Sequence, residues 1–165
     1  MDMSVKSLTM NIERAKSEHK KSVMAIIRDT DFFKPHEIDI AEEVFDDAIA
    51  DGDNGDYQSF VSKEGDNITG WVCFGQTPCT VGTFDIYWVA VSPKFQNRGI
   101  GKLLIQYAMD RIKACGGRMA VIETSGNQKY LSTQGFYEKI GFTKEACLKD
   151  FYAIDDDKLI YIKRV

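Results

Sequence analysis

The chain has 165 residues, of which 44% are apolar, and its 21 basic and 25 acidic side chains give a net charge of −4. This length predicts one domain over residues 1–165, and the apolar content excludes a disordered chain. No apolar run reaches the roughly 18 residues that cross a bilayer, which excludes a membrane-spanning protein, and the acidic balance argues against nucleic-acid binding.

The first half is predicted to hold one strand, two helices and then two strands. Alternating apolar and polar residues mark the strands, and apolar residues that recur every three or four positions mark the helices. In chain order these elements are expected at residues 8–12, 17–29, 38–50, 57–62 and 68–75. Turn-forming residues separate the last two strands, which predicts an antiparallel pair.

The second half is predicted to be a mixed α/β arrangement. Its expected elements are a strand at 83–91, a helix at 99–115, a strand at 119–124, a helix at 130–140 and strands at 142–149 and 158–164. The succession of strand, glycine-bearing turn, helix and strand over 83–124 predicts a crossover unit with two parallel strands.

One segment of this half points to an anionic ligand. Residues 93–118 hold six basic side chains and one acidic one, although the protein as a whole is acidic. Within it, Gly99 and Gly101 open a helix directly after a predicted strand. The first turn of a helix presents unpaired N–H groups and a positive dipole end, and glycines let an anion approach that backbone. This pattern is typical of a phosphate site, with Arg98 and Lys102 supplying further charge.

Two common nucleotide-binding motifs do not fit this segment. A P-loop ending in Gly101 and Lys102 needs glycine at position 96 and serine or threonine at 103, where the chain has Gln96 and Leu103. A dinucleotide fingerprint needs glycine or alanine at position 104, where the chain has Leu104. The phosphate-bearing ligand is therefore expected to be of another kind.

The sequence Gln-x-x-Gly-x-Gly at 96–101 resembles the signature of the GNAT superfamily of N-acetyltransferases. The sequence Phe-Tyr-x-x-x-Gly-Phe at 136–142 resembles a second signature of that family, and a predicted strand lies between the two. The resemblance implies the GNAT acyl-CoA N-acyltransferase fold. That fold has a central mixed, mostly antiparallel twisted sheet of about seven strands with helices on both faces.

The resemblance also implies acetyl-CoA as co-substrate, with no metal. In this family the loop amides bind the pyrophosphate, and the preceding strand binds the pantetheine arm and stabilises the oxyanion. Tyr137 is implied to protonate the departing thiolate over a short hydrogen bond. The implied cofactor-binding residues are Val89, Ala90, Val91, Gln96, Asn97, Arg98, Gly99, Ile100, Gly101 and Lys102.

The acceptor amine must lose a proton, because an alkyl ammonium is almost wholly protonated at neutral pH. Asp85, on the strand at 83–91, and Glu123, at the end of the next strand, are both candidates for the general base. The sequence leaves that choice open. Strand alternation predicts that Asp85, Tyr87 and Val89 share one face of the sheet.

The chain departs from the family pattern at one position. Where the family often has an asparagine that binds the pantetheine arm, this chain has Tyr130. Asn127 is the candidate for that role, with Ser125 as the alternative.

The sequence does not name the acceptor, and a small amine and a protein or peptide amine both stay open. Phe32, Phe33, Trp88 and Tyr152 are candidates for lining the acceptor pocket. The acidic stretch at 42–56 is interpreted as a solvated helix face and loop, and attraction of a cationic acceptor is the alternative.

Two other functions also stay open. One is a non-catalytic acyl-CoA sensor on the same fold, and the other is a nucleotide-binding module. The polar start of the chain and four scattered cysteines predict a cytoplasmic protein without disulfides. A homodimer paired through the C-terminal strands is a further option that the resemblance leaves open.

Overall fold

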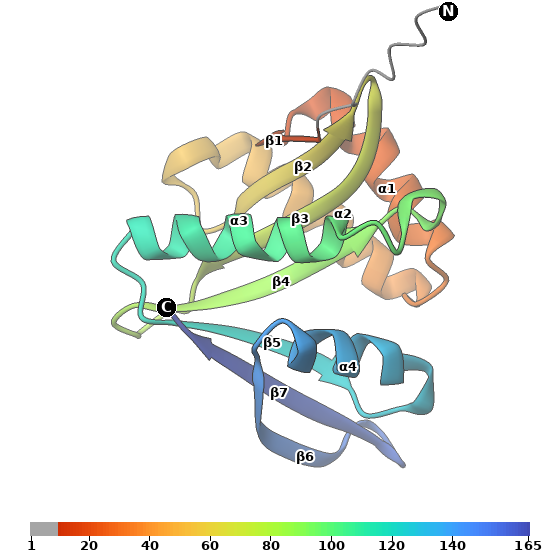
Figure 1. Cartoon of the computed structure of the whole chain (residues 1–165), viewed down its shortest axis with the longest axis vertical. Helices are drawn as coiled ribbons and strands as arrows, with labels where there is room; N and C mark the ends of the chain where they lie inside the picture. Colours follow the sequence, from red (N-terminus) through yellow and green to blue (C-terminus); the bar gives the residue numbers. More distant parts are fainter. Residues whose placement is uncertain (1–9) are drawn as a thin grey trace, which may run out of the picture.

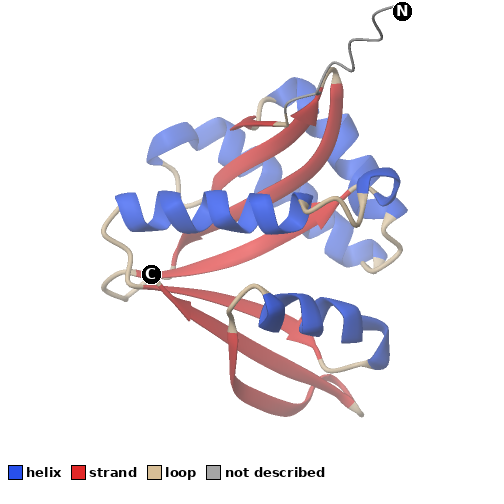
Figure 2. Ribbon diagram, in the orientation of Figure 1, coloured by secondary structure: helices blue, strands red, loops and turns tan. Residues whose placement is uncertain are grey.

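The computed structural model describes residues 10–165. These residues form a seven-stranded sheet with helices on both faces (Figure 1, Figure 2). The strand order is β1-β2-β3-β4-β5-β7-β6; β4 and β5 run parallel, and the other neighbours run antiparallel. The predicted mixed, mostly antiparallel sheet is therefore confirmed, as is the crossover from β4 to β5.

The strands are β1 (Asn11–Arg14), β2 (Gln58–Glu64), β3 (Asn67–Gln76), β4 (Thr83–Val91), β5 (Met119–Ser125), β6 (Thr143–Ala153) and β7 (Asp156–Arg164). The α-helices are α1 (Lys20–Asp29), α2 (Pro35–Asp51), α3 (Ile100–Ala114) and α4 (Leu131–Lys139). Short 3-10 turns are η1 (Ser17–His19), η2 (Gly52–Asn54), η3 (Pro93–Phe95) and η4 (Gln128–Tyr130). None of the helices within residues 10–165 combines the length and apolar character needed to cross a bilayer.

Most predicted elements lie within a few residues of the observed ones, and β4 has the predicted bounds. α2 begins earlier than predicted, at Pro35, because proline suits the first turn of a helix and the Glu37 carboxylate accepts the Lys34 N–H at 2.6 Å. The first predicted strand is displaced to β1, and its Leu8 lies outside the described residues.

The last hairpin differs from its prediction. β6 runs on to Ala153, because residues 149–152 bulge outward between two paired positions and stand opposite Asp157 alone. This extra loop brings Phe151 and Tyr152 out of the sheet, where 52% and 44% of their surfaces are exposed. The sequence prediction ends the first strand of this hairpin at residue 149 and begins the second at residue 158.

Two apolar cores hold the layers together. α3 and α4 cover one face of the sheet, and α1 and α2 cover the other (Figure 1). Leu104 and Ile112 are fully buried in the first core, and Phe45 and Trp71 in the second. Each such side chain stabilises the fold by about 1.5–3 kcal/mol through its burial. Together they fix the two halves of the sheet on which the cleft depends.

The feature that positions the site is the parting of β4 from β5. Only residues 83–85 of β4 pair with residues 119–121 of β5. Beyond these pairs the strands separate, as Figure 1 shows. Along the rest of their length, the facing edges of β4 and β5 thus have main-chain groups that are free to bind a ligand.

A bulge in β4 overturns one sequence prediction. The register with β3 shifts between Ile86 and Trp88, so Tyr87 has no partner. Before the bulge, Ile86 packs into the core under α3; after it, Val89 does, and Trp88 packs on the opposite face. The prediction that Asp85, Tyr87 and Val89 share one face is therefore wrong, because an extra residue reverses the alternation.

Candidate active site

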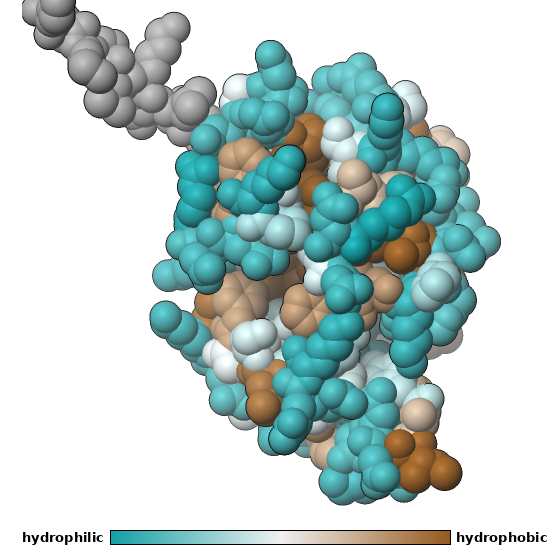
Figure 3. Space-filling view, turned by 90° about the vertical axis from the view of Figure 1, so that its right-hand side faces the viewer, coloured by the Kyte–Doolittle hydropathy of each residue, from teal (hydrophilic) through white to brown (hydrophobic). Residues whose placement is uncertain are grey.

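The parting of β4 and β5 opens a cleft with a volume of about 1340 Å³. Its walls come from both strands, the start of α3, α4, the loop between α1 and α2, and the β6–β7 hairpin. Figure 3 faces the wide end of this wedge and shows a hollow with tan and brown side chains inside a teal, hydrophilic border. Polar and apolar side chains contribute about equally to the lining of the cleft.

The predicted anion cradle lies at one end of the cleft. Gly99 precedes α3 with a φ of 79°, a left-handed conformation that costs other residues about 1–2 kcal/mol. The first helical hydrogen bond runs from the Leu103 N–H to the Gly99 carbonyl, at 3.0 Å. The N–H groups of Ile100, Gly101 and Lys102 consequently have no acceptor within the helix, and all three residues line the cleft.

The side chains around the cradle divide into two groups. Gln96, Asn97 and Lys102 line the cleft, as predicted for the cofactor-binding loop. Arg98 does not line it: its guanidinium pairs with the Glu64 carboxylate at 2.5 Å. The expectation that the Arg98 side chain adds charge at the cradle therefore differs from what the structure shows. An ion pair with the β2–β3 hairpin holds it away.

The free edge of β4 presents main-chain donors to the cleft. The Ser92 N–H donates to the Thr69 carbonyl at 2.9 Å, toward β3. Because alternate residues of a strand point their N–H groups in opposite directions, the N–H groups of Val91 and Val89 point toward the open side, and that of Ala90 points toward β3. Of the predicted cofactor-binding residues of this strand, Val89 and Val91 thus offer N–H groups to the cleft. Ala90 lines the cleft but offers no N–H group.

Tyr137 lies on α4 and lines the cleft, with only 6% of its surface exposed. Its ring packs against those of Phe142 and Tyr161, at centroid distances of 6.1 and 5.8 Å. Burial, followed by the nearby Tyr161, raises the pKa of the Tyr137 phenol well above its usual value of 10. The phenol consequently keeps its proton throughout the neutral and moderately alkaline range.

The two candidate bases lie at different depths of the cleft. Asp85 belongs to the last β4–β5 pair and accepts a hydrogen bond from the Thr77 hydroxyl at 2.6 Å. Glu123 lies two residues beyond that pair, in the open part, where its carboxylate binds the Lys158 ammonium at 2.6 Å. Both residues line the cleft.

Asn127 lines the cleft, but its own polar groups are engaged locally. Its side-chain oxygen accepts the Lys129 N–H at 3.0 Å, and its backbone N–H donates to the Ser125 hydroxyl at 3.0 Å. The Ser125 hydroxyl in turn donates to the Asp156 carboxylate. Asn127 thus caps η4, and its amide nitrogen is what it has left to offer a ligand.

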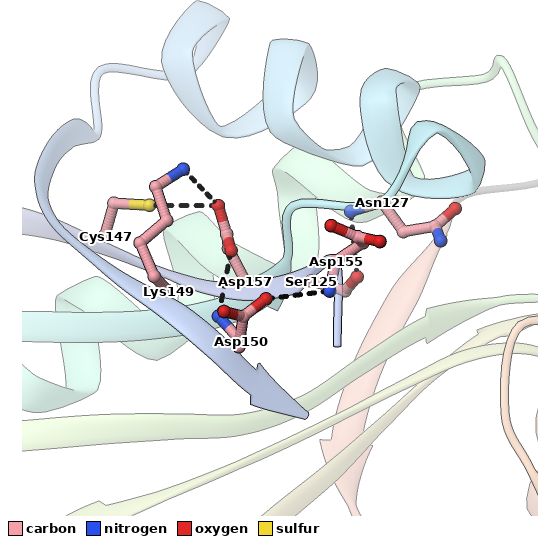
Figure 4. Close-up of polar contacts among 7 residues, drawn as sticks. All are labelled: Ser125, Asn127, Cys147, Lys149, Asp150, Asp155 and Asp157. Atoms are coloured by element: carbon pink, nitrogen blue, oxygen red, sulfur yellow. Dashed lines mark hydrogen bonds and ion pairs between the residues drawn. The ribbon is translucent and has the colours of Figure 1, made fainter. Parts of the chain in front are cut away.

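The hairpin that follows is held by a carboxylate network (Figure 4). The Asp157 carboxylate accepts hydrogen bonds from the Lys149 ammonium at 2.6 Å and from the Asp150 N–H at 3.0 Å. The Asp150 carboxylate accepts the Asp155 N–H at 2.8 Å. This network fixes the outward loop of β6 and so presents Tyr152 to the cleft.

Several cleft residues were not predicted from the sequence. Glu37 and Asp156 line the cleft, and Lys158 holds Glu123 from outside it. No spacing in the sequence joins these positions, because they come to the same cleft only in the folded chain. The four predicted aromatic residues, by contrast, all line the cleft: Phe32, Phe33, Trp88 and Tyr152.

The acidic stretch at 42–56 does not contribute to the cleft among the described residues. Two of its carboxylates, those of Glu42 and Asp46, bind the Lys20 ammonium at 2.9 and 2.8 Å. The interpretation as a solvated helix face and loop therefore fits the structure, and attraction of an acceptor by this stretch does not.

Comparison with known proteins gave matches to one family. The profile of the acetyltransferase (GNAT) family matches residues 22–142. A solved structure from Desulfovibrio desulfuricans, described as a GNAT-family acetyltransferase, is 38% identical, with a TM-score of 0.91 over 94% of this chain and 99% of that chain. Comparison with curated protein sequences gave no match.

More distant solved structures share the fold. The ribosomal-protein-S18-alanine N-acetyltransferase of Escherichia coli is 16% identical, with a TM-score of 0.75 over 95% of this chain and 94% of that chain. The PaiA N-acetyltransferase of Thermoplasma acidophilum, solved in complex with coenzyme A, is 15% identical, with a TM-score of 0.74 over 95% and 99% of the two chains.

Proposed function

The chain belongs to the GNAT family of acetyltransferases, and from that premise we propose that it transfers an acetyl group from acetyl-CoA directly to a primary amine. The observation that carries the proposal is the cleft, in which free strand N–H groups, a helix start and a buried phenol meet. No cysteine of the described residues lines it, so direct transfer is favoured over a thioester on the protein.

The cofactor would lie along the free edge of β4. The N–H groups of Ile100, Gly101 and Lys102 suit a diphosphate, because they combine unpaired donors with the positive end of the α3 dipole. The N–H groups of Val89 and Val91 suit the amides of a pantetheine arm and the oxygen of a thioester carbonyl. These groups are main-chain donors in fixed positions, so they need little rearrangement when a ligand binds.

The protein's part in the transfer begins with a carboxylate that takes a proton from the acceptor ammonium, directly or through water. Glu123 is better placed than Asp85, because it lies in the open part of the cleft. The amine then forms a bond to the thioester carbon while a β4 N–H stabilises the developing oxyanion. The carbon–sulfur bond breaks as the amide forms.

Tyr137 would supply the proton that the departing sulfur takes up. Burial raises the pKa of its phenol, and a thiolate that formed beside it would be destabilised by the same burial and would take up a proton more readily. The phenolate would regain its proton from the amine nitrogen, which has one more to lose. The balance is amide, free thiol and one proton released to solvent through the carboxylate.

A thiol-release assay with acetyl-CoA and a panel of amines tests the proposal. Wild-type protein should turn over at least one amine. Tyr137→Phe should lower kcat by about 100-fold or more while the Kd for coenzyme A stays within about twofold. Binding of coenzyme A with no turnover of any amine would favour the acyl-CoA sensor instead. Thermal protection by ATP but not by coenzyme A would favour a nucleotide-binding module.

We also propose that the protein works in the cytoplasm, where thiols stay reduced. All four cysteines are free, and Cys147, Cys115 and Cys79 are exposed. Pairing of two copies through the C-terminal strands stays a prediction, for which β6 at the sheet edge would be the site. Light scattering on the purified protein would measure the oligomeric state.

A further inference from the structure

Two contacts cross the wide end of the cleft between segments far apart in the sequence. The Tyr130 hydroxyl donates to the Phe32 carbonyl at 2.7 Å, and the two rings lie 5.4 Å apart. The Lys129 ammonium donates to the Asp31 carbonyl and lies 5.7 Å from the centre of the Phe32 ring. We call this set of contacts, between residues 31–32 and 129–130, the strap.

The strap joins the α1–α2 loop to η4, and all four of its residues line the cleft. In Figure 1 the end of β5 and the turn between α1 and α2 lie on the same side of the molecule, beyond the tip of β4. An opening that would otherwise lead outward between these two segments is therefore bridged on the face that carries α1 and α2.

A second wall comes from the β6–β7 hairpin. Tyr152 lines the cleft, and burial together with Glu123, Asp156 and Glu37 raises the pKa of its phenol to about 12. All three of these carboxylates belong to residues that line the cleft. The carboxylates of this region, those of Asp31, Glu37, Glu123 and Asp156, outnumber by one its ammonium groups, those of Lys34, Lys129 and Lys158. This balance suits a cation.

Aromatic rings form the inner wall of this end. The Phe33 and Trp88 rings meet edge to face with their centres 5.1 Å apart, and both residues line the cleft. Rings of this kind bind apolar bodies and also attract ammonium groups through their faces. A purely polar or polycationic acceptor would bring no apolar group to pack against these rings.

Resting on the proposed function, we propose that the acceptor is a small primary amine with an apolar or aromatic body, and that Tyr130 determines this choice by holding the strap closed. A protein or peptide acceptor needs an open groove through which the rest of its chain can leave. The strap joins two of the segments that line the cleft and so narrows the way out between them. A small amine does not need that way out.

The acceptor preference is tested with three probes in the thiol-release assay. They are 2-phenylethylamine, spermidine and a short peptide with a free N-terminal alanine. Wild-type protein should use 2-phenylethylamine with a kcat/KM at least about 10-fold above the other two, since apolar contacts of this size discriminate by 10- to 200-fold. A preference for the peptide or for spermidine would overturn the inference and leave the acetyltransferase proposal standing.

The role of Tyr130 is tested by removing its hydroxyl alone. Tyr130→Phe should raise the KM for 2-phenylethylamine by about 3- to 10-fold, the effect of one hydrogen bond, with kcat within about twofold. In this variant the ratio of kcat/KM for 2-phenylethylamine to kcat/KM for the peptide should become smaller. The Kd for coenzyme A should not change. Tyr107→Phe is the matched control, because Tyr107 packs on Phe60 in the core under α3 and lies outside the cleft.

Other results would overturn either the role of the strap or the acetyltransferase proposal. An unchanged KM and an unchanged preference in Tyr130→Phe would overturn the role of the strap. Should that variant fail to fold, Lys129→Met removes the other contact of the strap and carries the same expectation. Turnover of none of the probes or other amines, with coenzyme A bound, would instead overturn the acetyltransferase proposal itself and this inference with it.

Discussion

The two ends of the cleft are built in different ways. The cradle end comes from one continuous stretch, 96–102, and offers mainly backbone N–H groups. The acceptor end comes from the α1–α2 loop, the bulge of β4, η4 and the last hairpin, and offers side chains. A backbone cradle tolerates many sequences as long as its glycines remain, whereas every wall of the acceptor end can change independently. The structure thus separates a fixed donor site from an adaptable acceptor site.

The largest effect should come from the carboxylate that stands between the two ends. Glu123→Gln should lower kcat/KM by about 100-fold at neutral pH, because it removes the general base but keeps the size of the side chain. Asp85→Asn is the matched control at the closed end of the wedge and should cost less than about 10-fold. pH profiles of both variants, measured by thiol release, make the comparison.

A larger loss of kcat/KM in Asp85→Asn than in Glu123→Gln would assign the general base to Asp85. Equal, small effects would mean that water removes the proton without either carboxylate. If one of the two carboxylates is the base, the acid limb of the pH profile should disappear only in the variant that lacks that carboxylate.

An intermediate effect is expected at the cradle. A Cβ at Gly101 would lie 3.2 Å from Cζ of Phe136, and larger side chains would also fill the approach to the N–H groups. Gly101→Val should therefore raise the Kd for coenzyme A by about 10-fold and destabilise the fold by about 1–3 kcal/mol through overpacking. Calorimetric titration and urea unfolding measure the two quantities.

Gly135, which directly precedes the second signature, provides the contrast. A Cβ at Gly135, within α4, meets no atom within 4 Å. Gly135→Ala should leave the Kd for coenzyme A unchanged and stabilise the fold by about 0.5–1 kcal/mol, because alanine suits a helix better. Equal losses of affinity in both variants would contradict the distinction between the two glycines.

The smallest effect concerns the hairpin of the acceptor end. The hydrogen bond from Lys149, followed by that from the Asp150 N–H, lowers the pKa of Asp157 below 3.8. The resulting stabilisation is present at neutral pH and is lost as the pH falls from about 4 through the lowered folded value. Asp157→Asn should thus unfold at a slightly lower urea concentration at pH 7 and show a shallower loss between pH 5 and pH 2 than wild type.

Lys149→Met removes the partner of the same carboxylate. It should likewise make the loss of stability between pH 5 and pH 2 shallower. Parallel curves for wild type and both variants would mean that the network of Figure 4 does not stabilise the hairpin.

The sequence predicted the cradle half well, because its signals are local. The strand at 83–91, the glycines at 99 and 101 and the helix that follows lie within one stretch, and short-range propensities decide their form. The strand, the helix and their order were therefore correct. Tyr137 and Glu123 were predicted to belong to the same site, and both line the cleft.

Contacts between residues far apart in the chain could not be predicted, because local sequence patterns carry no information about them. The bulge at Tyr87 shows only in the register with β3, and it reversed the predicted face of Val89. Arg98 was expected at the cradle, but Glu64 holds it elsewhere. The role of Tyr130 depends on a carbonyl at Phe32, nearly a hundred positions away, which no spacing could reveal.

By itself, the sequence determined the elements, the mixed sheet and the donor loop, because helix starts, glycine conformations and apolar periodicity are properties of neighbouring residues. The tertiary structure alone decided how far β4 and β5 stay paired, which carboxylate stands in the gap and what crosses its wide end. Those features arise where segments remote in the chain compete for the same hydrogen bonds and the same space, and only the folded arrangement resolves that competition.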